Sequence, residues 1–247
     1  MSSRRAEDID WYWQPVDRPT DVDDSLVVSL LRNVPAGSRV LEIGVGAGYG
    51  LSQLAARAGC RCVGVDLLRS AMEASRETAR RAQVRMSLAL ASGFNLPFAD
   101  EAFDAVLSMG VVEHFPVAQS RQMLLEHARV CRRGGRVVVG APNALDCLHS
   151  VLRFWQGERY LYHPERSYTP WGLARELAAV GLAPVSRDGY GLFWSLREHE
   201  ATHAVAAVLH KTGLLSRMVR IRQRSVCALL GNMTVVAALK PGTPPTR

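Results

Sequence analysis

The sequence has no long hydrophobic run. Nowhere in its 247 residues do about 18 consecutive apolar side chains occur, which is the length that a helix needs to cross a bilayer. The first residues, Met1–Asp8, are polar and charged and lack the apolar centre of a secretory signal peptide. These two absences exclude a helical membrane span and a recognisable secretion signal, and they predict a cytoplasmic protein.

Cysteine is scarce. The chain has 5 cysteines, an odd number without the paired spacing of a zinc site, so neither a disulfide framework nor a bound metal is expected. Cys60 and Cys62 stand two residues apart in an apolar run, which places them on one face of a strand as packing residues. The thiols are expected to be reduced: Cys60, Cys62, Cys131, Cys147 and Cys227.

Acidic residues are outnumbered. The 23 acids against 30 basic residues leave a net charge of +7. Part of the excess lies in residues 214–224, and such a basic segment meets RNA phosphates, an anionic membrane or only solvent. The sequence leaves these three alternatives open. The arginines of this basic segment are Arg217, Arg220, Arg222 and Arg224.

The composition otherwise fits one globular domain. Hydrophobic residues make up 48% of the chain, and we find no internal repeat and no low-complexity tract. Short apolar runs alternate with helical patterns, which predicts a parallel sheet covered by helices on both faces.

Residues 40–50, Val-Leu-Glu-Ile-Gly-Val-Gly-Ala-Gly-Tyr-Gly, constrain function most tightly. Val40–Ile43 suits a buried strand, and a helix is predicted from about Tyr49 to Arg57. Between them, glycines 44, 46 and 48 let the backbone turn sharply and lie against a ligand where a Cβ would clash. The dinucleotide fingerprint requires a third glycine at position 49, where this chain has tyrosine, so a nicotinamide cofactor is excluded.

A second apolar run ends in an acid. Cys62–Asp66 reads as a strand, and Asp66 follows Gly44 by 22 residues. A carboxylate at this position accepts hydrogen bonds from ribose hydroxyls, or it caps the next helix. Ser70–Glu73 has the pattern of a capping box for that helix, which predicts that Asp66 is free to bind a ligand.

Three further segments follow in order: Gly93–Phe98, Phe103–Phe115 with its Glu113-His114 pair, and Arg129–Val139. Glycines and arginines in the last of them indicate the end of a helix before a fifth strand. Together with the first two motifs, these segments resemble class I S-adenosylmethionine (SAM)-dependent methyltransferases, in particular those of quinone biosynthesis and other small-molecule pathways. The similarity is continuous from Val40 to about Asn143.

The resemblance implies an α/β fold. We expect a Rossmann-like, seven-stranded, mostly parallel sheet of order 3-2-1-4-5-7-6, with the seventh strand antiparallel, helices on both faces and inserted lid segments. Within a single domain, the expected parts are an N-terminal lid (1–35), a SAM-binding core (36–143), a substrate-lid insertion (144–168), and a C-terminal part (169–240) that contains a basic insertion (190–232).

The resemblance also implies SAM as donor and S-adenosylhomocysteine as product. Glu42 is expected to hold the methionine ammonium, and Asp66 the ribose. At position 92, where the family usually has an aspartate for the adenine amino group, this chain has Ser92, a hydrogen-bond partner without charge assistance. The expected donor contacts are Glu42, Gly44, Gly46, Gly48, Asp66, Leu67, Ser92, Gly93, Phe94 and Met109.

The expected reaction is methylation of a small organic acceptor, most readily at a hydroxyl oxygen, then at nitrogen or carbon. A hydroxyl must lose its proton, and His114 is the leading base, with Glu113 to orient or replace it. A histidine here also has the alternative role of closing the loop over the donor. His199 is a second-rank base, and His127 is expected to lie away from the reaction. Aromatic and polar residues predicted to line the acceptor site are Trp13, Tyr49, Tyr160 and His163.

Other functions stay open at this stage. Nucleic-acid methyltransferases of the exocyclic-amine and cytosine-C5 types carry an Asn/Asp-Pro-Pro-aromatic segment or a Pro-Cys nucleophile. Here Ser108–Val111 and Ala141–Asn143 stand instead, so a nucleic-acid acceptor is not expected. An RNA methyltransferase using the basic segment, a membrane-associated enzyme with a lipid or glycan acceptor, and a SAM-binding protein without transfer activity are the alternatives. Peripheral membrane contact and oligomeric state are left open.

Overall fold

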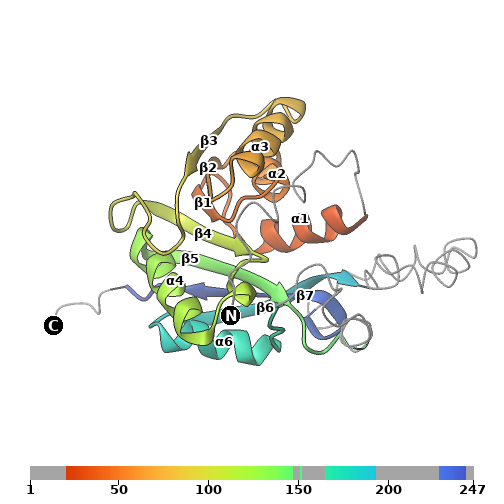
Figure 1. Ribbon diagram of the computed structural model, residues 1–247, viewed down its shortest axis with the longest axis vertical. Helices are drawn as coiled ribbons and strands as arrows, with labels where there is room; N and C mark the ends of the chain where they lie inside the picture. Colours follow the sequence, from red (N-terminus) through yellow and green to blue (C-terminus); the bar gives the residue numbers. More distant parts are fainter. Residues whose placement is uncertain (1–20, 147–150, 152–164, 193–227, 243–247) are drawn as a thin grey trace, which may run out of the picture.

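A computed structural model describes residues 21–146, 151, 165–192 and 228–242 (Figure 1). The helices and strands in chain order are α1 (Asp21–Asn33), β1 (Arg39–Ile43), α2 (Tyr49–Ala58), β2 (Arg61–Asp66), α3 (Arg69–Arg81), β3 (Met86–Leu90), β4 (Phe103–Met109), the 3-10 helix η2 (Val112–His114), α4 (Val117–Val130), β5 (Cys131–Pro142), α6 (Pro170–Ala179), β6 (Ala183–Leu192) and β7 (Gly231–Leu239).

The strands form one seven-stranded sheet of order β3-β2-β1-β4-β5-β7-β6. The pairs from β3 to β5 are parallel, whereas β7 runs antiparallel to both β5 and β6. This confirms the predicted strand order and the antiparallel seventh strand. Parallel strands end at the same edge of a sheet, so the segments after β1, β2 and β4 meet at one edge.

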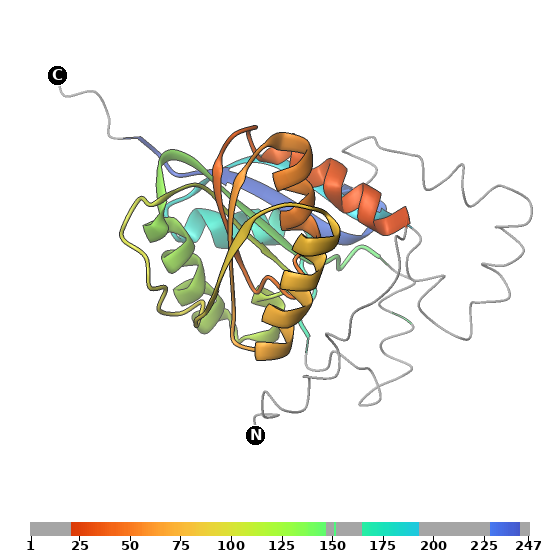
Figure 2. The same ribbon diagram turned by 90° about the horizontal axis from the view of Figure 1, so that it is seen from above.

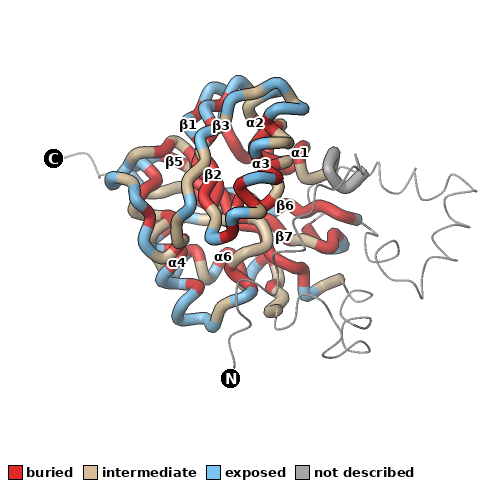
Figure 3. The backbone as a smooth tube through the Cα atoms, turned by 45° about the horizontal axis from the view of Figure 1, so that its top comes forward, coloured by how far each residue is buried: buried red, intermediate tan, exposed pale blue. Residues whose placement is uncertain are grey.

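Helices cover both faces of the sheet. Figure 2 shows α4 and α6 on one side, and α1, α2 and α3 on the other. Two apolar clusters fill the space between the layers, one under α4 and α6 and one under α1 and α2. Figure 3 shows the result, with buried strands at the centre and exposed positions on the outer surfaces of the helices. Long side chains such as Leu41 and Leu107 on the strands are fully buried because helices cover both faces.

Helix α1 is part of the helical layer. Its Val27 and Leu30 side chains are buried, and the Ser186 hydroxyl of β6 donates to the Asn33 side-chain oxygen at 2.6 Å. The segment expected as an N-terminal lid therefore includes a core helix at residues 21–33. Residues 1–20 lie outside the described part of the chain.

Helix α6 begins as its sequence predicts. Thr169 is the N-cap, its hydroxyl accepts from the Gly172 amide at 2.9 Å, and Pro170 occupies the first turn. The prediction that glycine ends α4 is wrong. The cap is Cys131 in extended conformation, and β5 starts there directly. Gly134, at φ 70°, lies within that strand, where its amide donates to the Lys240 carbonyl at 2.8 Å.

The described segments show where the two predicted insertions leave the sheet and return to it. The two ends of the 144–168 insertion lie side by side after β5. The Ala144 amide donates to the Tyr168 carbonyl at 2.9 Å, and the Tyr168 amide donates to the Pro142 carbonyl at 2.8 Å. The second insertion was expected at 190–232, but β6 continues to Leu192 and β7 begins at Gly231. Only residues 193–230 are thus available for it.

Within the described residues, no helix combines the length and the apolar character needed to cross a bilayer. Cys60, Cys62 and Cys131 are buried free thiols. In the same part of the chain, no three histidine, cysteine or acidic side chains gather as a metal site.

Candidate functional site

The glycine turn connects β1 to α2 at the carboxyl edge of the sheet. Gly44, Gly46 and Gly48 all have positive φ, at 71°, 52° and 71°. The amides of Gly44 and Val45 donate to the Val65 carbonyl at 2.9 and 3.0 Å, which joins the turn to the end of β2. Gly48 is the N-cap of α2, with no side-chain cap. Residues that carry a side chain rarely adopt a positive φ, so the turn requires glycine.

Neighbouring protein atoms explain part of this glycine requirement. A Cβ on Gly44 would collide with the Val111 side chain, and one on Gly48 would lie 2.9 Å from the Ser75 hydroxyl and 3.2 Å from the Met86 methyl. The atoms that these two glycines accommodate therefore belong to the segment after β4, to α3 and to β3. The sequence prediction attributed the clash to the ligand alone. Packing within the protein requires glycine at both positions.

Glu42 is a buried acid directly beneath the turn. Its side chain is 6% exposed, and Oε2 has no hydrogen-bond partner among the described residues. Burial, and then the nearby charge of Asp66, raise the pKa of Glu42 to about 8. A buried carboxylate oxygen without a partner is costly, so a cationic or hydrogen-bond-donating ligand at this place would stabilise it.

Asp66, at the end of β2, is bound to the turn. Its Oδ2 accepts from the Gly46 amide at 3.0 Å, and its Oδ1 accepts from the Leu68 amide at 3.1 Å. The predicted capping box is wrong, because α3 begins at Arg69 after the N-cap Leu68, which has no side-chain cap bond. Asp66 itself supplies the bond to Leu68. It therefore shapes the turn, and each carboxylate oxygen keeps a second lone pair for a ligand.

These residues fit an adenosyl sulfonium ligand that carries an ammonium group. Two carboxylates, Glu42 and Asp66, flank a turn whose backbone approaches closely. Leu67, beside Asp66, is an apolar side chain left 59% exposed, which suits a flat apolar ring. The buried Glu42 oxygen without a described partner favours a cationic ligand over a phosphate-rich one.

The segment after β3 carries the residues predicted to meet adenine. Ser92 is half-buried, and its hydroxyl accepts from the Phe94 amide at 3.3 Å. The Phe94 ring packs edge-on against Phe115, with centroids 5.0 Å apart. Gly93 is buried, and a Cβ there would lie 2.8 Å from the Ile43 side chain. Gly93 thus packs against β1, and Ser92 closes the local turn.

Arg129, in the last turn of α4, holds the loop between β3 and β4. It donates to the carbonyls of Leu96 and Phe98 at 3.1 and 2.8 Å, and it pairs with Glu126 and Asp100. Glu126 in turn accepts from the Leu96 amide at 3.0 Å. The loop that begins with the predicted adenine contacts is therefore held by one guanidinium.

Replacing Arg129 with alanine is expected to lower the free energy of unfolding by about 1 to 3 kcal/mol, because charge-assisted bonds to loop carbonyls are lost. Urea denaturation monitored by circular dichroism measures this change. Arg175→Ala, on exposed α6, is the control and is expected to change stability by less than about 0.5 kcal/mol. Equal stability of the two variants would contradict the proposed anchoring.

The segment after β4 carries the predicted catalytic pair. Met109 ends β4, and its sulfur would lie 2.5 Å from a Cβ on Gly140 of β5. Glu113 in η2 is buried, Oε2 has no described hydrogen-bond partner, and burial raises its pKa well above the usual value. His114, the next residue, is exposed. The two side chains thus occupy different environments.

Comparison with known proteins agrees with this geometry. Residues 41–139 match the family model described as "Methyltransferase domain". The chain is 32% identical over 161 residues to a ubiquinone biosynthesis O-methyltransferase of Rhizobium etli, covering 62% of this chain and 63% of that protein. It is 34% identical over 109 residues to the methyltransferase GfsG of Streptomyces halstedii, covering 43% of this chain and 38% of that protein. Residues 41–139 form a class I SAM-dependent methyltransferase domain.

The methyltransferase domain shares its fold with solved structures. One is from a complex of the Haloferax volcanii Trm112 methyltransferase activator, with a TM-score of 0.66, 18% identity and coverage of 97% of this chain and 99% of that chain. At this identity the likeness shows the fold alone. The chain spans less than two thirds of the length of the two relatives compared by sequence, those of Rhizobium etli and Streptomyces halstedii.

The sequence prediction missed a polar cluster beside Glu113. The Arg166 amide donates to the Glu113 carbonyl at 3.1 Å, and the Arg166 guanidinium donates to the Ser120 hydroxyl at 3.2 Å and to the Tyr168 hydroxyl. Glu165 lies near enough to raise the pKa of Glu113. No periodicity connects residues this far apart in the chain. The only available signal was their position just before α6.

The remaining predicted site residues have mixed outcomes. Tyr49 is half-buried at the start of α2. His127 lies in α4, the helix before β5, where it is buried, and Nδ1 is 2.7 Å from the Met123 carbonyl oxygen. The remaining predictions fall outside the described residues of the chain: Trp13, Tyr160, His163 and His199, together with the basic segment 214–224.

Proposed function

We propose that this protein binds SAM at the glycine turn and transfers the methyl group to a hydroxyl oxygen of a small organic acceptor. The observation that carries the proposal is the buried Glu42 oxygen without a partner, beside a turn that Asp66 shapes. With a pKa of about 8, Glu42 is largely protonated in the ligand-free protein at neutral pH, and a ligand that brings an ammonium group to this place favours its ionised form. The family model matched by residues 41–139 supports the same donor.

Each residue then has a defined task. Glu42 holds the ammonium of the donor, Asp66 accepts from the ribose hydroxyls, and Leu67 and Phe94 flank the adenine. When bound, SAM supplies a methyl carbon on a positively charged sulfur that an in-line nucleophile displaces. The protein contributes mainly alignment, which is worth about 7 to 11 kcal/mol when reacting groups are well oriented. S-adenosylhomocysteine is the expected product.

The acceptor proton needs a base after β4. Burial raises the pKa of Glu113, which disfavours its ionised form and therefore its use as a carboxylate base. His114 is exposed at the same edge of the sheet, and imidazole is the side chain most often used for proton transfer near neutral pH. We therefore assign the base role to His114, and to Glu113 the role of a neutral hydrogen-bond donor to the acceptor.

The assignment of a hydroxyl acceptor has two supports. The Rhizobium etli relative is named as an O-methyltransferase, and a histidine base suits a hydroxyl that must lose a proton. The acceptor pocket is proposed to involve Tyr49, Trp13, Tyr160 and His163. An activator protein is a further possible partner, since the archaeal neighbour was solved in a complex with one.

Two measurements test the proposal. Calorimetric titration with SAM and with S-adenosylhomocysteine measures donor binding directly. Incubation with methyl-labelled SAM and fractionated host extract then identifies the fraction that takes up label. Absence of binding to both compounds would contradict the site. Binding without label transfer to any fraction would favour the non-catalytic alternative, whereas label in RNA or lipid fractions would favour the other two alternatives.

Replacing His114 with alanine is expected to slow turnover by about 10²- to 10⁴-fold and to change donor affinity by less than about threefold, because a general base contributes that much to rate. Single-turnover label transfer over pH 5.5 to 9 measures the effect. The wild-type rate is expected to rise with pH as the imidazole loses its proton, and to lose this step in the variant. An unchanged pH profile would contradict the base role.

A further inference from the structure

A second concave surface lies at the edge of the sheet opposite the glycine turn. It is a groove of about 1070 Å³ between α2, α3 and the starts of β1, β2 and β3. We call it the arginine groove. Five arginines line it, and no acidic residue does: Arg39, Arg61, Arg76, Arg80 and Arg85.

All five arginines are exposed. Arg39 is steadied by the Phe103 ring, 5.0 Å from its guanidinium carbon, and Arg80 is paired with Glu77 at the rim. Asp104, which accepts from the Arg39 amide, is also bound to Arg132. Glu77 thus neutralises Arg80, one of the five, whereas Asp104 is bound by Arg132 outside the groove. The four other arginines leave more positive than negative charge at the groove.

The spacing of the cations fits a chain of phosphates better than a single anion. Arg39 and Arg61 are register partners at the starts of adjacent strands, whose backbones are about 5 Å apart. Arg85 immediately precedes β3. Arg76 and Arg80 form a second row, one turn apart on α3, which packs on the other face of the sheet from the one that Arg39 shares with Phe103. One phosphate engages one or two guanidinium forks. An extended anion that follows the strand starts can therefore meet both rows, whereas a single phosphate cannot.

The shape and floor of the groove narrow the choice of partner. A concave surface cannot lie flat against a bilayer, whereas a flexible strand can enter it. Small and apolar side chains such as Ala55, Cys62 and Leu88 line the floor, and no aromatic residue is among the lining residues. The nucleobases of a nucleic-acid strand would meet an apolar surface without aromatic stacking partners. Binding would therefore depend on charge and show little sequence preference.

We propose that the arginine groove binds the phosphate backbone of single-stranded nucleic acid, at a site separate from the methyl-transfer centre. This binding does not depend on the function proposed for the glycine turn. The two sites lie at opposite edges of the sheet, so binding at one can be tested while the other is empty.

Fluorescence anisotropy with a labelled oligouridine of about 20 nucleotides tests the proposal on the full chain. The logarithm of the affinity is expected to fall with that of the salt concentration with a slope near −3, from about 0.7 counterion per phosphate contact over four to five contacts. An oligothymidine of equal length is expected to bind within about threefold, because the phosphate backbone is the shared element.

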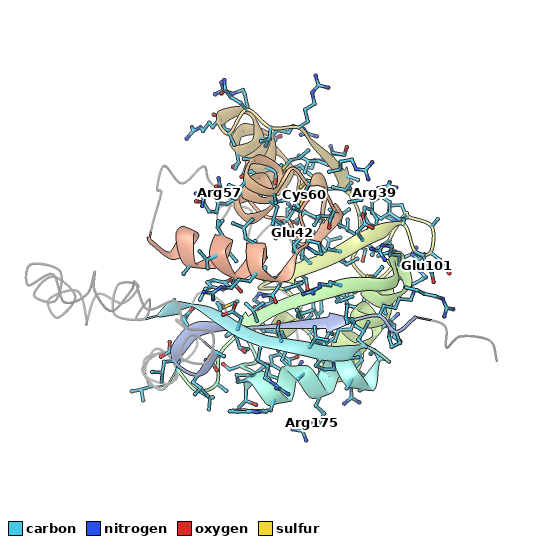
Figure 4. All side chains as sticks on the ribbon, turned by 180° about the vertical axis from the view of Figure 1, so that it is seen from behind. Arg39, Glu42, Arg57, Cys60, Glu101 and Arg175 are labelled. Carbon is cyan, nitrogen blue, oxygen red and sulfur yellow. The ribbon has the colours of Figure 1, made fainter. Side chains whose placement is uncertain are left out.

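Variants localise the binding. Arg61→Glu with Arg85→Glu is expected to weaken binding by at least about tenfold, and Arg61→Lys with Arg85→Lys to retain it within about threefold. The matched control is Arg175→Glu with Arg187→Glu, which changes the net charge equally on α6 and β6. Figure 4 shows Arg175 far from Arg39 and Cys60. Calorimetric S-adenosylhomocysteine affinity, unchanged in the groove variant, confirms folding and separates this proposal from the donor site.

Four results would overturn the proposal: equal loss in the control pair, equal competition by polyglutamate, binding lost only in Arg220→Glu with Arg222→Glu, or selective binding to phosphatidylglycerol vesicles instead of oligonucleotides. Loss confined to the glutamate groove variant, with retention by its lysine counterpart, supports it. Failure to bind S-adenosylhomocysteine with intact oligouridine binding would contradict the proposed methyl transfer and leave the arginine groove standing.

Discussion

Replacing Glu42 with glutamine is expected to weaken SAM binding by about 10- to 150-fold while making the ligand-free protein more stable. The loss of affinity follows from removing a buried, charge-assisted bond to the ammonium, worth about 1.5 to 3 kcal/mol. The gain in stability follows from removing a buried acid that has no described partner for Oε2. Opposite signs for binding and stability are typical of a group retained for its ligand.

The pH dependence has a definite sign. Burial, with the charge of Asp66, raises the pKa of Glu42 from 4.5 to about 8. Between these values the folded protein retains a proton that the unfolded chain releases, so this group makes stability fall as pH rises from 4.5 through 8. Glu42→Gln removes the fall, and the free energy of unfolding at pH 8 should increase by about 2 to 4 kcal/mol.

Urea denaturation at pH 5 and pH 8, with calorimetry of S-adenosylhomocysteine binding, measures both effects. The control is Glu101→Gln, which removes one negative charge at an exposed position (Figure 4) and is expected to change donor affinity by less than about twofold. If Glu42→Gln bound the donor like the wild type, the ammonium assignment would be wrong. A loss of stability in the variant at pH 8 would show that the buried acid has a structural partner.

Replacing Asp66 with alanine is the second large effect. We expect donor affinity to fall by at least about 100-fold, because the variant loses the ribose contact and also the acceptors for the Gly46 and Leu68 amides. The turn itself is then less ordered before the ligand arrives. Stability should fall by about 1 to 3 kcal/mol, the cost of leaving partly buried donors unsatisfied.

Asp66→Asn separates the two contributions. Its amide oxygen still accepts from one backbone amide, so most of the stability should return, while the charged acceptor for ribose is absent and affinity should stay at least about tenfold below the wild type. Ser92→Ala is the matched control on the adenine side, with an expected change below about threefold. Wild-type affinity in both Asp66 variants would remove Asp66 from the site.

Local chemistry made much of the fold predictable. The apolar run ending at Ile43, the glycines after it and the Thr169-Pro170 helix start each specify a conformation through residues close in sequence. The end of α4 was not predictable in this way. Gly134 has the positive φ expected of a helix terminator, yet it lies within β5, because pairing with β4 and the bond to Lys240 extend that strand back to Cys131.

The candidate site shows the same division. The sequence by itself determined the class of fold, the acid on β1, the acid ending β2 and the glycine turn between them, since motif spacing encodes these local features. Only the tertiary structure decided that Asp66 fastens the turn, that Gly44 and Gly48 accommodate protein side chains, that Glu113 is buried beside Arg166, and that five arginines meet in one groove. These properties depend on burial and on contacts between residues distant in the chain, and no local pattern specifies either of them.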